Sequence, residues 1–233
     1  MPETEPVTLR HITLATDLTA KSDRAFERAV DLARRWNARL LIVHAVEERP
    51  RMTDGDPSWR RGADPVEAAR IKLQFEYPGW ESVATTLDVR SGTPEEVVLS
   101  AAAREHTDLI VTGIAREDYY GRDELGSLVP ALIRKAVAPV LVVKKRVTGA
   151  PRRVIVASDL SDTSHAALRL ALGLFGPARI ALFNAFDVPY RGLAGDKEEL
   201  ERTMRPGVME ECRKLLVDTA GSTAASHVEI IAE

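Results

Sequence analysis

Two parts of the sequence combine carboxylate, hydroxyl and glycine positions in a pattern that suits a phosphorylated ligand. Asp17 directly follows the apolar run His11–Thr16, and its carboxylate could accept hydrogen bonds from a ribose or face a metal–phosphate complex. The second part is the segment that runs from Gly113 to Gly126 and Ser127. Glycine lets backbone amides approach a phosphate closely, and a serine hydroxyl at a helix start adds a donor. These residue types predict an anion or nucleotide site.

A simpler interpretation of Asp17 stands beside this one. An aspartate after a strand often caps the turn and helix that follow, and Thr19 or Ser22 could share that role here. Both roles can hold together, so the residue type alone leaves the choice open.

These residues need a scaffold, and the sequence predicts a parallel sheet. Short, nearly continuous apolar runs are typical of strands that are covered on both faces. Helical patterns separate them, with helix starts marked by Asp64-Pro65 and Thr93-Pro94. Strands that alternate with helices predict an α/β fold with a doubly wound open parallel sheet, whose ligands bind at the carboxyl ends of the strands. The predicted strands are His11–Thr16, Arg39–Ala45, Thr86–Arg90, Asp108–Thr112 and Val140–Val143.

The chain then repeats itself. The stretch that starts at Val154 (VIVASDLSDTSHAALRLALGL) echoes the one that starts at Ile12, so that Asp159 corresponds to Asp17. The last apolar run, His227–Ala232, falls where the first copy has its third strand. A repeat of this length indicates duplicated domains. We expect a complete domain over residues 8–147 and a partial second copy over residues 151–233 that ends near its third strand.

In the segment from Gly113 to Ser127, the chain resembles the universal stress protein family. In that family a G-x2-G-x9-G-[S/T] stretch binds the phosphates of ATP. Gly113 and Gly126-Ser127 are in register with that motif, and Arg116 stands at its middle glycine. The resemblance implies the fold of the adenine nucleotide alpha hydrolase-like proteins, with strand order 3-2-1-4-5. With Arg116 in place of glycine, the backbone at this position loses the conformational freedom of glycine, although the guanidinium of Arg116 could itself bind phosphate.

The resemblance also implies a set of site residues in the first domain. Asp17 would contact the ribose, Ala45 and Val46 would lie near the adenine, and the glycine segment would hold the phosphates. The second copy offers Asp159 but nothing that replaces the glycine segment, so we expect no independent nucleotide site there. The full set of expected cofactor-binding residues is Ala15, Thr16, Asp17, Ala45, Val46, Thr112, Gly113, Arg116, Gly126, Ser127 and Leu128.

Three functions compete. The leading hypothesis is a non-enzymatic stress-response module that binds ATP or another adenine nucleotide in its first domain. The alternative is a nucleotide hydrolase or transferase that uses the same cleft, but none of the five histidines has metal-ligand spacing and no nucleophile–base pair is evident. A receiver-like phosphoacceptor domain is a distant third, because Asp17 has no adjacent acid.

The composition and net charge of the chain indicate which partners it can bind and in which cellular compartment it is found. The net charge of −3 argues against general nucleic-acid affinity, and no apolar run approaches the roughly 20 residues of a membrane helix. The single cysteine, Cys212, cannot form an internal disulfide, which favours a cytoplasmic location. The resemblance implies a homodimer that pairs through Val140–Val143.

Overall fold

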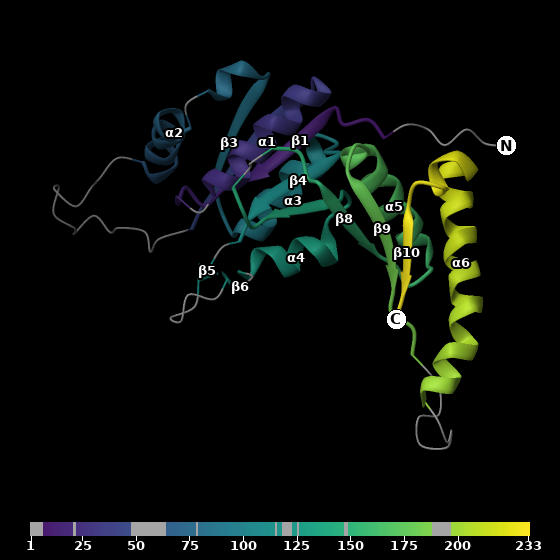
Figure 1. Ribbon diagram of the computed structural model, residues 1–233. Helices are drawn as coiled ribbons and strands as arrows, with labels where there is room; N and C mark the ends of the chain where they lie inside the picture. The colour runs from purple at the N-terminus through teal and green to yellow at the C-terminus, as the bar shows by residue number, and fades with distance from the viewer. Residues whose placement is uncertain are drawn as a thin grey trace. The chain divides into compact units, whose positions relative to one another are not determined.

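The chain folds into two compact units. The computed structural model describes residues 7–233 except 21, 48–63, 78, 115, 118–122, 125, 147–148 and 188–196. The first unit is Leu9–Thr148, and the second is Gly149–Glu233 together with the start of the chain up to Thr8. Figure 1 shows a sheet with helices in each unit. No helix in the described part of the chain has the length and apolar character of a membrane span.

The first unit is built on a five-stranded parallel sheet with the order β3-β2-β1-β4-β7. This is the predicted doubly wound sheet with order 3-2-1-4-5, so the expected fold class is confirmed. A two-residue antiparallel pair, β5 (Arg116–Glu117) with β6 (Asp123–Glu124), follows β4. The sheet strands are β1 (His11–Ala15), β2 (Arg39–Val46), β3 (Thr85–Ser91), β4 (Leu109–Gly113) and β7 (Val140–Val143).

Helices cover both faces of this sheet (Figure 1). The helix α1 (Asp23–Trp36) packs a face of alanines, Phe26 and Val30 against β1 and β4. The helices α3 (Pro94–Arg104) and α4 (Leu128–Lys135) form one apolar cluster with β2 and β4. The helix α2 (Pro65–Glu76) and the short helix η2 (Trp80–Ser82) lie before β3. The predicted caps are present: Val66 N donates to Asp64, and Glu96 N donates to Thr93.

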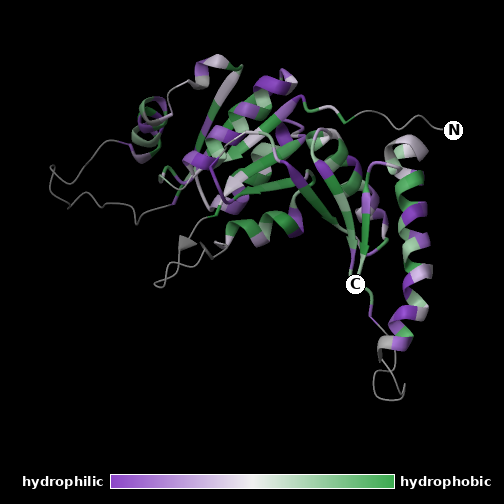
Figure 2. Cartoon of the chain, viewed as in Figure 1, coloured by the Kyte–Doolittle hydropathy of each residue, from purple (hydrophilic) through white to green (hydrophobic). Residues whose placement is uncertain are grey.

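The core follows from the apolar strands. The central strands β1 and β4 are hydrophobic along most of their length (Figure 2), and Ile12 and Ile110 are fully buried. Parallel strands that are buried on both faces need such continuous apolar sequence. Ile12 pairs with Leu40 of β2 on one side and with Leu109 of β4 on the other, which fixes the relative ends of all three strands.

The second unit repeats the first half of this pattern. Its parallel sheet has the order β10-β9-β8, which matches β3-β2-β1. Its outer strand β8 has one neighbour among the described residues, and Ile155 on it is 69% exposed. The elements are β8 (Arg153–Ala157), α5 (Asp162–Phe175), β9 (Arg179–Asn184), α6 (Lys197–Ala225) and β10 (Glu229–Ala232).

The two units carry separate natural probes for unfolding. All three tryptophans (Trp36, Trp59 and Trp80) belong to the first unit, whereas the only cysteine, Cys212, is buried in the second. We predict that a thiol reagent labels Cys212 at urea concentrations below those that change the tryptophan fluorescence, because the smaller, open-edged sheet unfolds first. The labelling rate of fully unfolded protein supplies the reference. Coincident transitions would show that the chain unfolds as one cooperative body.

Candidate functional site

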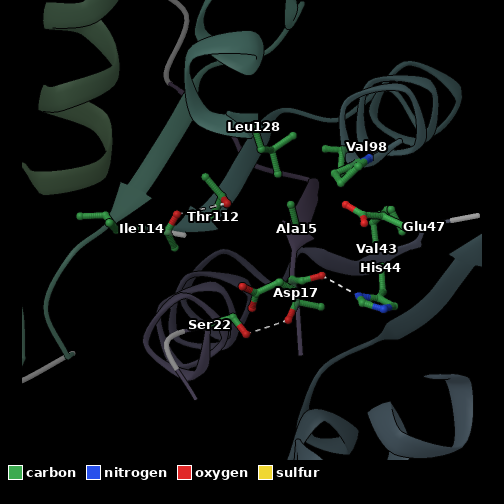
Figure 3. A pocket seen from close by; sticks show the side chains of 14 residues that line it. Ala15, Asp17, Ser22, Val43, His44, Glu47, Val98, Thr112, Ile114 and Leu128 are labelled. Carbon is green, nitrogen blue, oxygen red and sulfur yellow. Dashed lines mark hydrogen bonds between the residues drawn. The ribbon is translucent and has the colours of Figure 1, made fainter. Parts of the chain in front are cut away.

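A cavity of about 270 Å³ opens at the carboxyl ends of β1, β2 and β4 (Figure 3). The strand β1 contributes its end and the following Asp17, while β2 contributes Val43, His44 and Ala45. The start of α4 closes the cavity with Leu128. In an open α/β sheet, the crevice outside the strand ends at the switch point of the strand order is where ligands bind. Here that point lies between β1 and β4, at this cavity.

The structure brings together most of the residues that we expected from the sequence. Seven of them line this one cavity: Ala15, Thr16, Asp17, Ala45, Thr112, Gly113 and Leu128. The lining does not include Val46, which ends β2, or the buried Gly126 and exposed Ser127 that precede α4. The backbone of Arg116 pairs with Glu124 in the β5–β6 hairpin.

Several lining residues were not among the expected ones. The cavity is also lined by Ser22, Val43, His44, Glu47, Pro94, Val98 and Ile114. Glu47 and Ile114 each follow the end of a strand, so the rule that strand ends face the ligand could have found them. Val98 lies one helical turn inside α3, where only the packing of the helix against the sheet brings it to the cavity.

The turn after β1 holds Asp17 in place. Its Oδ1 atom accepts hydrogen bonds from the backbone N–H of Thr19 (3.0 Å) and from the Thr19 hydroxyl (2.8 Å). Leu18, between them, has a left-handed backbone with φ 58°. The carboxylate therefore does stabilise its turn, as the simpler interpretation proposed. Its second oxygen, Oδ2, receives no hydrogen bond from the described residues, and the side chain is exposed beside the cavity.

His44 makes a hydrogen bond that shows which of its two ring nitrogens carries the hydrogen. Its Nδ1 atom lies 2.8 Å from the backbone carbonyl of Thr16, and because a carbonyl only accepts, Nδ1 carries the hydrogen. In the second unit Asn184 stands at the equivalent position, and its Nδ2 donates to the carbonyl of Ser158 over 2.8 Å. Histidine and asparagine share an N–H donor, which is the feature that this position requires.

The corresponding turn of the second unit holds its aspartate more tightly. Oδ1 of Asp159 accepts from the hydroxyl of Ser161 (2.5 Å), from the Ser161 backbone N–H (3.1 Å) and from the hydroxyl of Ser164 (2.8 Å). Hydrogen bonds to the charged form, chiefly from the Ser161 hydroxyl, lower the pKa of Asp159 to about 2. The hollow beside it is lined by β8, α5, β9 and the residues that follow these strands, and its described lining includes no fourth strand and no glycine segment.

Metal binding was assessed over the same described residues. None of them form a group of three or more His, Cys, Asp or Glu side chains that could hold a metal ion.

Comparisons with known proteins agree with this fold. The profile of the universal stress protein family matches residues 8–144. A relative from Staphylococcus aureus (strain USA300), described as a universal stress protein, is 27% identical over 146 residues, which are 59% of this chain and 86% of the relative. Because the family profile matches more than half of the chain, the chain belongs to the universal stress protein family.

Two solved structures resemble nearly the whole chain. A functionally unknown protein from Pseudomonas aeruginosa PAO1 has a TM-score of 0.65 and 16% sequence identity, and covers 97% of this chain and 74% of its own. A universal stress protein from Pseudomonas aeruginosa UCBPP-PA14 has a TM-score of 0.62 and 18% identity, with 96% and 74% coverage. At this level of identity, these likenesses show the fold.

Proposed function

We propose that the first unit binds ATP or another adenine nucleotide in the cavity at the ends of β1, β2 and β4. The observation that carries the proposal is that Asp17, which follows β1, and Gly113, which ends β4, line one cavity with Leu128. Figure 3 shows Asp17 and Leu128 at this cavity. The protein would act as a non-enzymatic stress-response module whose nucleotide occupancy is read by partners. We also infer a cytoplasmic location, and propose neither a nucleic acid nor a membrane as partner.

The chemistry of the cavity changes from one side to the other. Val43, Ala45 and Val98 provide an apolar side that suits a purine base. The start of α4 at Leu128 provides backbone N–H groups and the positive end of a helix dipole, which favour phosphate, and Gly113 has no side chain to hinder its approach. The volume of about 270 Å³ is close to the lower end of ordinary small-molecule sites, roughly 300 Å³. A nucleoside would fill it, with its phosphates extending along Gly113.

Asp17 suits the ribose between these two sides. Its Oδ2 atom is not used by the described residues, and a carboxylate accepts hydrogen bonds from hydroxyl groups. The turn that holds Oδ1 fixes the direction in which Oδ2 faces, so the acceptor is oriented before the ligand arrives. Such preorganisation reduces the entropy lost on binding.

The alternative function is a nucleotide hydrolase or transferase in the same cleft. Glu47 favours it, because this second carboxylate lines the cavity together with Asp17. His44 is consistent with it as well, because the hydrogen bond from Nδ1 to the Thr16 carbonyl leaves Nε2 as the ring nitrogen that could accept a proton. A single-turnover incubation of excess protein with MgATP separates the two functions. Retention of intact ATP supports the binding module, and formation of ADP or a transferred product supports the enzyme.

The nucleotide proposal predicts different effects for two matched substitutions. Asp17→Ala and Asp159→Ala each remove the acceptor that closes an equivalent turn, but only Asp17 faces the proposed ligand. In calorimetric titrations with MgATP, we predict that Asp17→Ala weakens binding about 10-fold, as expected for a lost hydrogen bond to a charged group. Asp159→Ala should leave the Kd unchanged. Equal effects of both substitutions, or no binding by the unaltered protein, would contradict the proposal.

We also propose that two copies of the chain pair along β7. This strand ends the five-stranded sheet, and Val140, Leu141 and Val142 on it are half-buried. Beside it, Ile133 is 64% exposed and Val137 is 84% exposed. An apolar edge with open backbone groups favours association, and a two-fold axis would let the same strand meet itself.

This pairing predicts a dimer in sedimentation at about 50 μM, well above the Kd range of stable specific dimers. Val142→Lys should yield monomers, because a charge on an edge strand opposes pairing. The control is Ile155→Lys on β8, the exposed edge strand of the second unit, which should remain dimeric. A monomeric unaltered chain would refute the pairing, and dissociation by Ile155→Lys alone would move the contact to β8.

A further inference from the structure

Two helices begin beside the cavity, and the start of α3 is already capped. This helix contributes Pro94 and Val98 to the lining, and Pro94 has no N–H to donate. The N–H of Glu96 donates to the Thr93 side chain over 3.3 Å, and the N–H of Val97 donates to the Thr93 carbonyl over 3.1 Å. The side of the cavity formed by α3 is therefore mainly apolar and has little to offer a phosphate.

The helix α4 begins without such a cap. Ser127 precedes it, and the Ser127 side chain accepts no hydrogen bond from the first turn. The N–H groups of an uncapped first turn remain available to a ligand, and the helix dipole favours an anion there. A nucleotide in this cavity is therefore oriented with its phosphates toward Leu128 of α4 and its base toward Val98 of α3.

On the base side, two backbone carbonyls at the end of β2 are engaged within the fold. The carbonyl of Val43 accepts from the Thr16 N–H over 3.0 Å, and the carbonyl of Val46 accepts from the Gly92 N–H over 3.1 Å. Val46 is also absent from the cavity lining, although the family resemblance places it near the adenine. Recognition of the base edge therefore falls to other groups.

Glu47 provides an open acceptor at this place. Figure 3 shows its carboxylate on the same side of the cavity as Val43 and Val98. It makes no hydrogen bond or ion pair with the described residues. The neighbouring His44 instead donates from Nδ1 to the Thr16 carbonyl. An ionised carboxylate accepts hydrogen bonds and donates none, so Glu47 suits a base that presents N–H groups.

We propose that Glu47 is a specificity-determining residue of the first unit: its carboxylate accepts a hydrogen bond from the exocyclic amino group of the base. The inference rests on the proposed nucleotide site and names the feature of adenine that this site recognises. Adenine carries such an amino group at N6, whereas an unsubstituted purine has no donor there. The apolar contacts with Val43 and Val98 suit both bases, so the choice between them depends on Glu47.

Two ligands that differ only in this amino group test the inference. In calorimetric titrations, we expect the unaltered protein to bind MgATP about 10-fold more tightly than the magnesium complex of purine riboside 5′-triphosphate, the effect of one hydrogen bond to a charged group. Glu47→Ala should abolish this preference. The ratio of the two Kd values is the readout, because any repulsion between Glu47 and the phosphates affects both ligands equally.

Glu81→Ala is the matched control. Glu81 is an exposed glutamate of η2 in the same unit and does not line the cavity, so this variant loses the same charge and should keep the preference. Equal binding of the two ligands by the unaltered protein would overturn the inference, as would a preference that survives Glu47→Ala. Either result would leave nucleotide binding itself intact.

The same comparison with the nucleosides adenosine and purine riboside separates the inference from the proposed function. If the protein binds no ATP or other adenine nucleotide but prefers adenosine through Glu47, the proposed function fails and the role of Glu47 holds. If neither adenosine nor an adenine nucleotide binds, both are overturned.

Discussion

The pairing of β1 with β2 on one side and β4 on the other determines where chemistry can occur in this protein. Parallel strands end at the same edge of a sheet, so this pairing brings Asp17, Ala45 and Gly113 to one cavity. The strand order reverses between β1 and β4, so the chain leaves these strands toward opposite sides and the crevice between them stays open. The apolar core that fixes the register, with Ile12 between Leu40 and Leu109, thus also positions the site.

The described part of the second unit shows what this constraint means when no strand pairs with the free side of β8. Its described sheet repeats the order of β3, β2 and β1, and its first turn repeats the backbone of the Asp17 turn. It has no described strand beside β8 to form the other wall, and Ser164 Oγ adds a hydrogen bond to Oδ1 of Asp159. Both aspartates hold their turns through Oδ1, and the described residues leave Oδ2 unbonded in both. The two turns therefore differ mainly in the walls beside them, which the duplicated sequence motif alone does not reveal.

The sequence predicted the strands well because each is an apolar run with clear limits. The run Val140–Val143 coincides with β7, and Arg39–Ala45 differs from β2 by one residue. The strand order came from the family resemblance. The prediction for the glycine segment was less complete, because motif spacing does not describe the path of the chain between Gly113 and Gly126, where a β-hairpin lies. The hydrogen bond between the hydroxyls of Tyr77, just after α2, and Thr16 could not be predicted, because it joins residues 61 positions apart and depends on the stacking of Tyr77 on Phe26.

The most direct test of the central claim, that ligand binding belongs to the first unit and uses its Asp17 turn, is an amide NMR titration of the whole chain with MgATP. Because the two turns are equivalent in backbone structure, each serves as the internal reference for the other. We predict saturable shifts at Thr16–Thr19, Gly113 and Leu128, with Ser158–Ser161 unchanged. Shifts of equal size at both turns, or shifts confined to the second unit, would contradict the claim.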